Sequence, residues 1–188
     1  MVITSKTINA KNPVRYWILL GIAFISLMGT LLHFVYDWSG NLIIVGIFAP
    51  INESVWEHLK MAFWPTLIWW FSGYLFLEKN QKINGSQWIF SCTISALISP
   101  LFILTFYYTY TGALGIHSLF LDISSFFISV IVAQILALYV YSYDKIHHYW
   151  FYCSLTMLAL ITAAFIIYTF MPPHIPLFID TSSGKFGI

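Results

Sequence analysis

The sequence predicts an all-α protein, a polytopic bundle of transmembrane helices, from its composition and its pattern. Hydrophobic residues make up 60% of the 188 residues and charged residues 8%, whereas a soluble domain carries about 25% charged residues. The mean hydropathy is +0.82. Five apolar stretches have the length of about 20 residues that crosses a bilayer as a helix. We expect one transmembrane domain over 1–188, with the lipid bilayer as its partner.

The five expected spans follow one another through short connections. The first comes after Lys6, Lys11 and Arg15, and because its apolar run is longer than that of a signal peptide, we expect it to be retained. The last is followed by a tail over 172–188, whose prolines and glycines argue against a helix. The spans are expected at about 16–36, 53–77, 87–110, 118–141 and 149–171.

The segment 41–51, between the first two spans, is short for a membrane span, and if it did cross, Lys79, Lys82 and Lys145 would lie outside, which the distribution of basic residues disfavours. Its apolar part, NLIIVGIFAP, has ten residues. As a helix these would reach about 15 Å, half the hydrocarbon thickness. We therefore expect a re-entrant segment or half-span here.

The start of the second span combines helix caps with ionisable residues. Asn52 is a favourable N-cap residue, and Ser54 and Glu57 have the spacing of a capping box. Lys60, three residues after Glu57, is expected to neutralise it. Capping does not account for His58, which lies on the same helical face as Ser54. We therefore expect a site as well as a helix start.

The basic residues predict the orientation. Six of the eight Lys and Arg residues fall on one side of the five spans, and the side richer in positive charge is cytoplasmic. The N-terminus is then inside and the C-terminus outside. The inner group is Lys6, Lys11, Arg15, Lys79, Lys82 and Lys145, and the outer group is Lys60 and Lys185. A net charge of +1 without a basic run argues against a nucleic-acid partner.

Most other ionisable residues fall at the outer face, namely five of the seven acidic residues and four of the six histidines. Ionisable groups at membrane depth are costly and face a cavity or a partner. Asp122 has no basic residue in its own span, so it needs a partner from another span. We expect these residues to form one outward-facing pocket.

The residue types in this pocket predict a catalytic zinc site, because three protein ligands plus a water are the usual pattern of such sites. A carboxylate would serve as base or as fourth ligand. The expected metal ligands are His33, His58 and His117; the expected catalytic carboxylates are Glu53, Glu57 and Asp122; and the expected pocket-lining residues are Asp37, Asn52, Ser54, His174 and Asp180.

Two resemblances arise from these motifs. NESVWEHLK, with HSLFLDISSF, resembles a family of small bacterial multi-span membrane proteins of unknown function over most of the chain, which implies a multi-pass protein of the bacterial plasma membrane. Ser54-x-x-x-His58 is similar to the SxxxH motif of the alkaline ceramidase and adiponectin-receptor superfamily of intramembrane zinc hydrolases. That resemblance implies a zinc-ligand role for His58 and a site role for Ser54, although the superfamily's last-span HxxxH is absent here and five spans replace seven.

Three functions fit this pattern. The first, which we favour, is an intramembrane metal-dependent hydrolase acting on a lipid-type substrate. The second is a transporter of a small solute or ion, or a membrane subunit that captures a substrate, since carboxylates and histidines also form ion and proton sites. The third is a structural membrane partner without a site, which predicts polar residues dispersed around the bundle.

Overall fold

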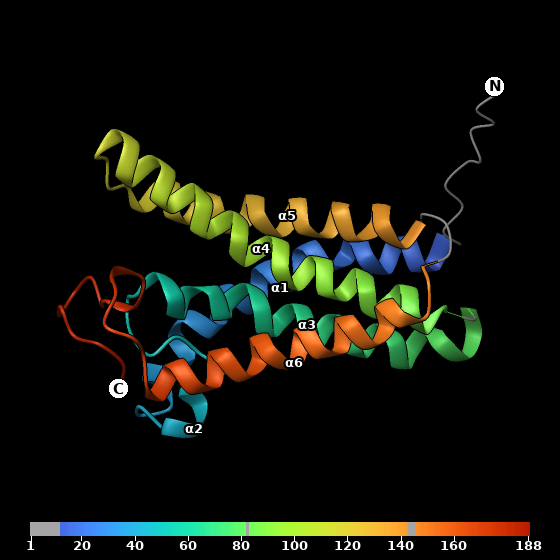
Figure 1. Cartoon of the computed structure of the whole chain (residues 1–188), viewed down its shortest axis with the longest axis horizontal. Coiled ribbons are helices and arrows are strands. Elements are labelled where there is room, and N and C mark those ends of the chain that lie inside the picture. The colour runs from blue at the N-terminus through green and yellow to red at the C-terminus, as the bar shows by residue number, and fades with distance from the viewer. Residues whose placement is uncertain (1–11, 82, 143–145) are drawn as a thin grey trace.

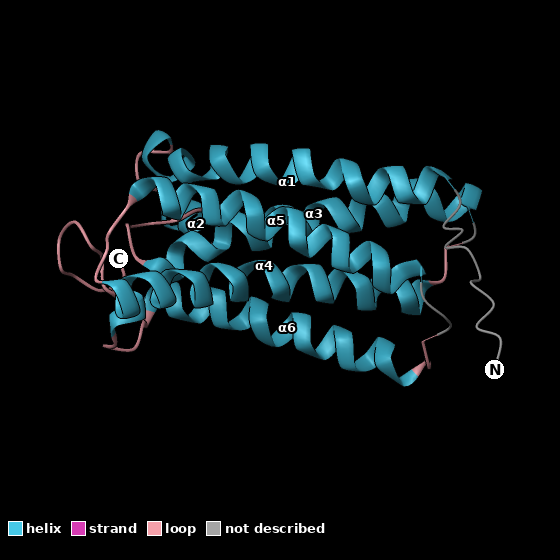
Figure 2. Ribbon diagram, turned by 90° about the horizontal axis from the view of Figure 1, so that it is seen from above, coloured by secondary structure: helices cyan, strands magenta, loops and turns pink. Residues whose placement is uncertain are grey.

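The computed structural model describes residues 12–81, 83–142 and 146–188, and it confirms the all-α prediction. Over these residues five long helices run side by side (Figures 1 and 2). They are α1 (Asn12–Trp38), α3 (Val55–Gln81), α4 (Gly85–Leu114), α5 (Leu119–Ser142) and α6 (Tyr149–Phe170).

Four of these helices are long and apolar enough to cross a membrane: Pro13–Trp38 of α1, α4, α5 and α6. The remaining helix, α3, has 27 residues and would be about 40 Å long, more than the hydrocarbon thickness. Its Trp residues and the charged Glu57 and Lys60 near its start make it less apolar, and it is not among the described helices that qualify. The helix α3 therefore has the length of the expected second span, but it is not apolar enough to count among the candidate membrane spans.

The core lies around α3, and one cluster of buried residues draws on all five long helices. It includes Ile25, Phe63, Ile103, Phe126 and Phe165, which come from α1, α3, α4, α5 and α6 in turn. Burial in one common cluster fixes the helices against one another.

The end of the bundle that carries the C-terminus is called the tail end below (Figure 1). The start of α3 and the ends of α1 and α6 lie there. Arg15 and Lys79, which belong to the group expected inside, lie near the start of α1 and the end of α3, at the opposite end of the bundle. Lys6, Lys11, Lys82 and Lys145 lie outside the described residues.

Two connecting segments shape the tail end. In the expected half-span, only the four residues of α2 (Ile43–Gly46) are helical. The chain then runs irregularly to the start of α3. The tail was expected to be without helix, but it contains a short 3-10 helix, η1 (Pro176–Phe178), because Pro176 at its first position presets the backbone angle. An isolated antiparallel bridge joins Ile179 and Phe186.

Candidate metal site and cavity

The start of α3 is capped largely as predicted. The Oγ of Ser54 accepts a hydrogen bond from the Glu57 N–H at 3.3 Å, and the Oδ1 of Asn52 accepts one from the Ser54 N–H at 3.0 Å. Ser54 is therefore the N-cap, and Asn52 supports it. The Glu57 carboxylate does not complete the capping box, since it accepts hydrogen bonds from the Ile51 N–H at 3.1 Å and from Lys60 at 2.6 Å.

The cap also orients His58. The Nδ1 of His58 lies 2.8 Å from the carbonyl oxygen of Ser54. Because a carbonyl oxygen only accepts hydrogen bonds, Nδ1 carries the proton, and in the neutral ring Nε2 presents a lone pair. This Nε2 lies 3.4 Å from the Oε2 of Glu53. Two acceptors then face each other, an arrangement that a cation or a second proton on the ring would satisfy.

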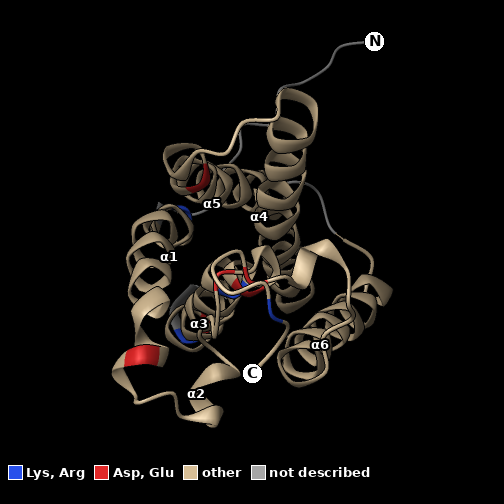
Figure 3. Ribbon diagram, turned by 90° about the vertical axis from the view of Figure 1, so that its left-hand side faces the viewer, with Lys and Arg blue, Asp and Glu red and all other residues tan. Residues whose placement is uncertain are grey.

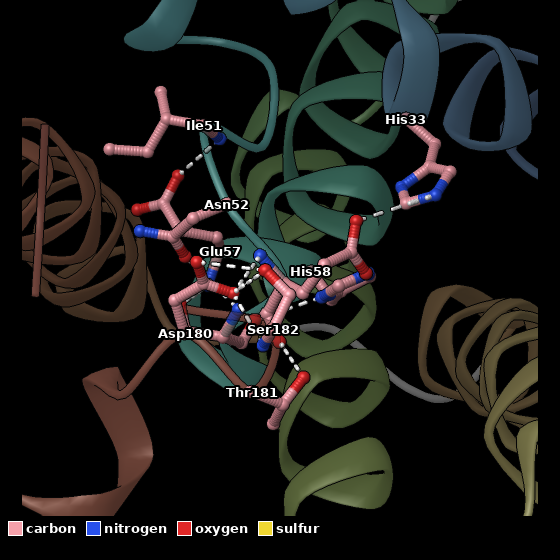
Figure 4. Close-up of polar contacts among 10 residues, drawn as sticks. His33, Ile51, Asn52, Glu57, His58, Asp180, Thr181 and Ser182 are labelled. Carbon is pink, nitrogen blue, oxygen red and sulfur yellow. Dashed lines mark hydrogen bonds and ion pairs between the residues drawn. The ribbon is translucent and has the colours of Figure 1, made fainter. Parts of the chain in front are cut away.

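His33 approaches the same carboxylate from α1. Its Nε2 lies 4.0 Å from the Oε1 of Glu53, and the two histidine rings are 5.3 Å apart between centroids. One ligand atom from each of His33, Glu53 and His58 lies within 4.8 Å of the other two. Figure 4 shows both histidines and, close to His58, the tail residues Asp180, Thr181 and Ser182.

The spacing of these three residues fits a transition-metal ion. Tetrahedral zinc with bonds of about 2.0–2.1 Å holds its ligand atoms roughly 3.4 Å apart. The His58 Nε2 lies 3.4 Å from the Oε2 of Glu53, which has this value. The His33 Nε2 lies 4.0 Å from the other oxygen, Oε1, so the two histidines face different oxygens of the carboxylate. Two imidazoles and a carboxylate are also the donor set of several catalytic zinc sites, in which a fourth position stays open.

Glu53 is ionised at neutral pH. The hydrogen bond and charge of His58, together with the charge of His33, hold the pKa of Glu53 below its ordinary value, against burial and the charge of Asp180, which raise it. The site therefore keeps a negative charge that a metal ion or a protonated histidine would balance.

A cavity of about 600 Å³ opens beside the three residues. His33, Glu53 and His58 lie on one of its walls, and Asp122 on α5 lines it too. Most of the lining is apolar and comes from α1, α3, α4 and α5: Phe34, Met61, Ile103, Leu119, Ile123, Phe126 and Phe127. The volume lies within the range of small-molecule binding sites.

The sequence predicts that Asp122 needs a partner from another span. In the structure this partner is a tyrosine on α4. The hydroxyl of Tyr110 on α4 donates a hydrogen bond to the Oδ1 of Asp122 at 2.5 Å. Tyr110 is itself buried, while Tyr107, one turn earlier, lines the cavity. No sequence signal pointed to Tyr110, because α4 carries many aromatic residues and only the packing of α4 on α5 selects this one.

Glu57 belongs to a separate, buried network. Its Oε2 lies 2.6 Å from the Nζ of Lys60, as the sequence predicted, and neither side chain is more than 3% exposed. Lys60 also donates hydrogen bonds to the Gly46 carbonyl at 2.8 Å and to the Thr169 hydroxyl at 2.6 Å. Glu57 is absent from the lining of the cavity, and its contacts fit a structural role.

A second cavity, of about 200 Å³, adjoins two of the three residues, His33 and Glu53, at the tail end. Like the first, it is lined by His33 and Glu53, and Asp37, Asn52 and Asp180 also line it. Asp180 is 7% exposed and accepts hydrogen bonds from Ser182, Ser183 and the Glu53 N–H. Burial raises the pKa of Asp180, but these hydrogen bonds outweigh it and lower the pKa to about 2.

Four expected site residues line neither cavity: Ser54, Glu57, His117 and His174. His117 is exposed in the loop between α4 and α5, and among the described residues it is not part of the group that could hold a metal. His174 is exposed in the tail, with its ring 4.6 Å from that of Phe186. The structure thus brings together two of the three predicted histidine ligands.

Four helices long and apolar enough to cross a membrane are the feature of a polytopic α-helical membrane protein. Figure 3 looks onto the tail end of the bundle and shows acidic residues on α1, on α5 and near α3. The chain belongs to the family described as "Family of unknown function (DUF6512)", which matches residues 6–188. The resemblance to a family of unknown function is thereby confirmed. No curated protein and no solved structure matches the chain.

Proposed function

We propose that the protein is a zinc-dependent hydrolase that acts within the membrane on a lipid-type substrate. One observation carries the proposal: His33, Glu53 and His58 bring their ligand atoms within 4.8 Å of one another on the wall of a mainly apolar cavity. This convergence also argues against a purely structural membrane partner, for which polar residues would be dispersed around the bundle.

The proposed topology has five spans, α1, α3, α4, α5 and α6, with the N-terminus inside and the tail outside. The length of α3 supports its role as a span, because a helix of about 40 Å placed among four apolar helices would cross with them. The positions of Arg15 and Lys79, at the end opposite Lys185, support the orientation. The proposed membrane is the bacterial plasma membrane, as the resemblance of the sequence implies.

The site residues and the cavity walls would have separate roles in the reaction. His33, Glu53 and His58 would hold the ion, which when bound supplies Lewis acidity and an activated water. The apolar walls of the cavity would bind the hydrocarbon part of the substrate. Asp122, with the Tyr110 hydroxyl 2.5 Å away, would hold or donate a proton at the substrate's polar group. His117 has no part in this proposal.

The test is a hydrolysis screen with the purified full-length protein in detergent, on long-chain esters and amides. We expect cleavage of at least one class, loss of activity on chelation and recovery on adding zinc. Asp122→Asn should lower kcat about 100-fold or more if Asp122 transfers a proton, with zinc content unchanged. Activity that survives both chelation and the His58→Ala substitution would contradict the proposal.

A second candidate, capture of a cation or small solute, rests on the position of the cavity. Its lining residues come from the halves of the helices nearest the tail end and from the loop and tail there, so the cavity favours binding from one side over conduction. Stoichiometric zinc without hydrolysis of any ester or amide in the screen would favour this alternative.

A further inference from the structure

Among the three residues of the proposed metal site, only Glu53 lies outside the helices. His33 lies within α1 and His58 within α3, whereas Glu53 belongs to the irregular stretch 50–54 between α2 and α3. The Glu53 side chain is 50% exposed, so packing alone does not hold it. Something else has to keep its carboxylate between the two histidines.

The C-terminal segment 179–187, called the strap below, binds the backbone of Glu53 on both sides. The Glu53 N–H donates a hydrogen bond to the Oδ1 of Asp180 at 3.3 Å, and the Glu53 carbonyl accepts one from the Oγ1 of Thr181 at 3.2 Å. One residue earlier, the side-chain amide of Asn52 donates to the Gly187 carbonyl at 3.3 Å. Three hydrogen bonds thus join two adjacent residues to a segment more than 120 positions away.

The strap is itself a closed turn, so it can act as a fixed support. The Asp180 N–H donates to the Lys185 carbonyl at 2.9 Å, and the Gly184 N–H to the Asp180 carbonyl at 2.8 Å. The Asp180 carboxylate accepts hydrogen bonds from Ser182 and Ser183 as well. Ahead of the strap, the buried Phe178 packs against Trp56 on α3, with 4.9 Å between ring centroids.

We propose that the strap is a positioning element of the metal site, in which Asp180 and Thr181 act through Glu53 and so set the affinity for zinc. The inference rests on the proposed function, because it needs His33, Glu53 and His58 to bind the ion. Groups that orient the ligands of a metal typically contribute 10–100-fold to its affinity. Linkage is reciprocal, so bound zinc should in turn make the strap more protected.

The first experiment measures zinc affinity by competition with a chromophoric chelator, for the full chain in detergent. Thr181→Val removes the hydroxyl donor at nearly constant volume, and Asp180→Ala removes the acceptor. We expect zinc to bind about 10-fold more weakly to each variant than to the wild type. Lys185→Gln is the matched control in the same turn, since only the backbone of Lys185 takes part in the hydrogen bonds above, and it should bind within about twofold of the wild type.

Hydrogen exchange of the same four proteins, with and without zinc, separates positioning from stability. We expect zinc to slow exchange in residues 180–185 of the wild type and the control. Thr181→Val should show faster exchange in residues 50–55 while the exchange of the helices stays unchanged. A loss of helix protection in Asp180→Ala would show that this variant is misfolded. Thr181→Val alone would then test whether the strap positions the metal site.

The outcomes distinguish this inference from the proposed function. If the wild type binds zinc and Thr181→Val binds it equally well, the strap does not position the site, although the metal site stands. If the wild type binds no zinc, the proposed function fails. The exchange of residues 50–55 without metal then decides whether the strap holds Glu53: faster exchange in Thr181→Val than in Lys185→Gln supports that hold, and equal exchange overturns it.

Discussion

At the scale of single residues, Lys60 is a fully buried charged residue with three hydrogen-bond partners. Its ammonium group is fully buried and bonds to Glu57, to the carbonyl of Gly46 at the end of α2, and to Thr169 on α6. A buried charge is tolerated only when its hydrogen bonds are satisfied. Lys60 therefore joins the end of α2 and the start of α3 to α6.

Removing this ammonium group should destabilise the protein strongly. In Lys60→Met the Glu57 carboxylate stays buried without its cation, and breaking a buried pair in this way costs about 3–5 kcal/mol. The free energy of unfolding in detergent, measured by denaturant titration, gives the comparison.

The double variant Lys60→Met with Glu57→Gln is the control for this prediction. It removes both charges, and the amide oxygen introduced by the second substitution can still accept from the Ile51 N–H, so part of the lost stability should return. Equal stability of Lys60→Met and the wild type would show that the pair contributes nothing.

At the scale of the helices, Gly29 sets the distance of α1 from α3 and α5 next to the cavity. A methyl group at Gly29 would overlap the Met61 carbonyl oxygen on α3 and would lie 2.6 Å from the Phe126 ring on α5. Met61 and Phe126 both line the cavity. A glycine at this position thus lets three helices approach closely.

The substitution Gly29→Ala should separate these helices and lower the free energy of unfolding by about 1–3 kcal/mol. Gly112→Ala on α4 is the matched control, since a methyl group there meets nothing within 4 Å. This control should leave the stability unchanged or raise it by up to about 1 kcal/mol. Thermal or denaturant unfolding in detergent measures both, and an equal effect of the two substitutions would refute the account of Gly29.

The sequence predicted the long helices better than it predicted the site, for a physical reason. Apolar runs of about 20 residues, the cap at Ser54 and the pair of Glu57 with Lys60 are local patterns that spacing reveals. The partner of His33 is not local. Asp37 lies four residues later on α1, but the carboxylate 4.0 Å from the Nε2 of His33 is that of Glu53, from another segment.

The same limit applies to the tail and to α5. The strap meets Glu53 from a distance of 127 residues along the chain, and Tyr110 meets Asp122 through the packing of α4 on α5. Neither contact follows from the spacing of residues, because each depends on how separate elements are arranged in space. Conversely, His117 had a favourable residue type, but the loop between α4 and α5 leaves it exposed.

At the scale of the whole molecule, the orientation in the membrane determines which side supplies the substrate and the metal. The proposed topology places Lys185 outside and Lys79 inside. Both side chains are exposed, so Lys185→Cys and Lys79→Cys can each report on one side in a Cys92→Ala, Cys153→Ala background. We expect a membrane-impermeant maleimide to label position 185 in intact cells and position 79 only after permeabilisation. The reverse pattern would invert the orientation.

The metal content of the protein tests most directly whether His33, Glu53 and His58 form a metal site. Protein purified in detergent, supplied with zinc and then freed of unbound ions, should hold close to one zinc per chain by elemental analysis. His58→Ala and Glu53→Gln should each lose most of it, whereas His117→Ala should keep it, because His117 lies apart from the group. A wild-type protein without zinc, or equal zinc in all four proteins, would contradict the account.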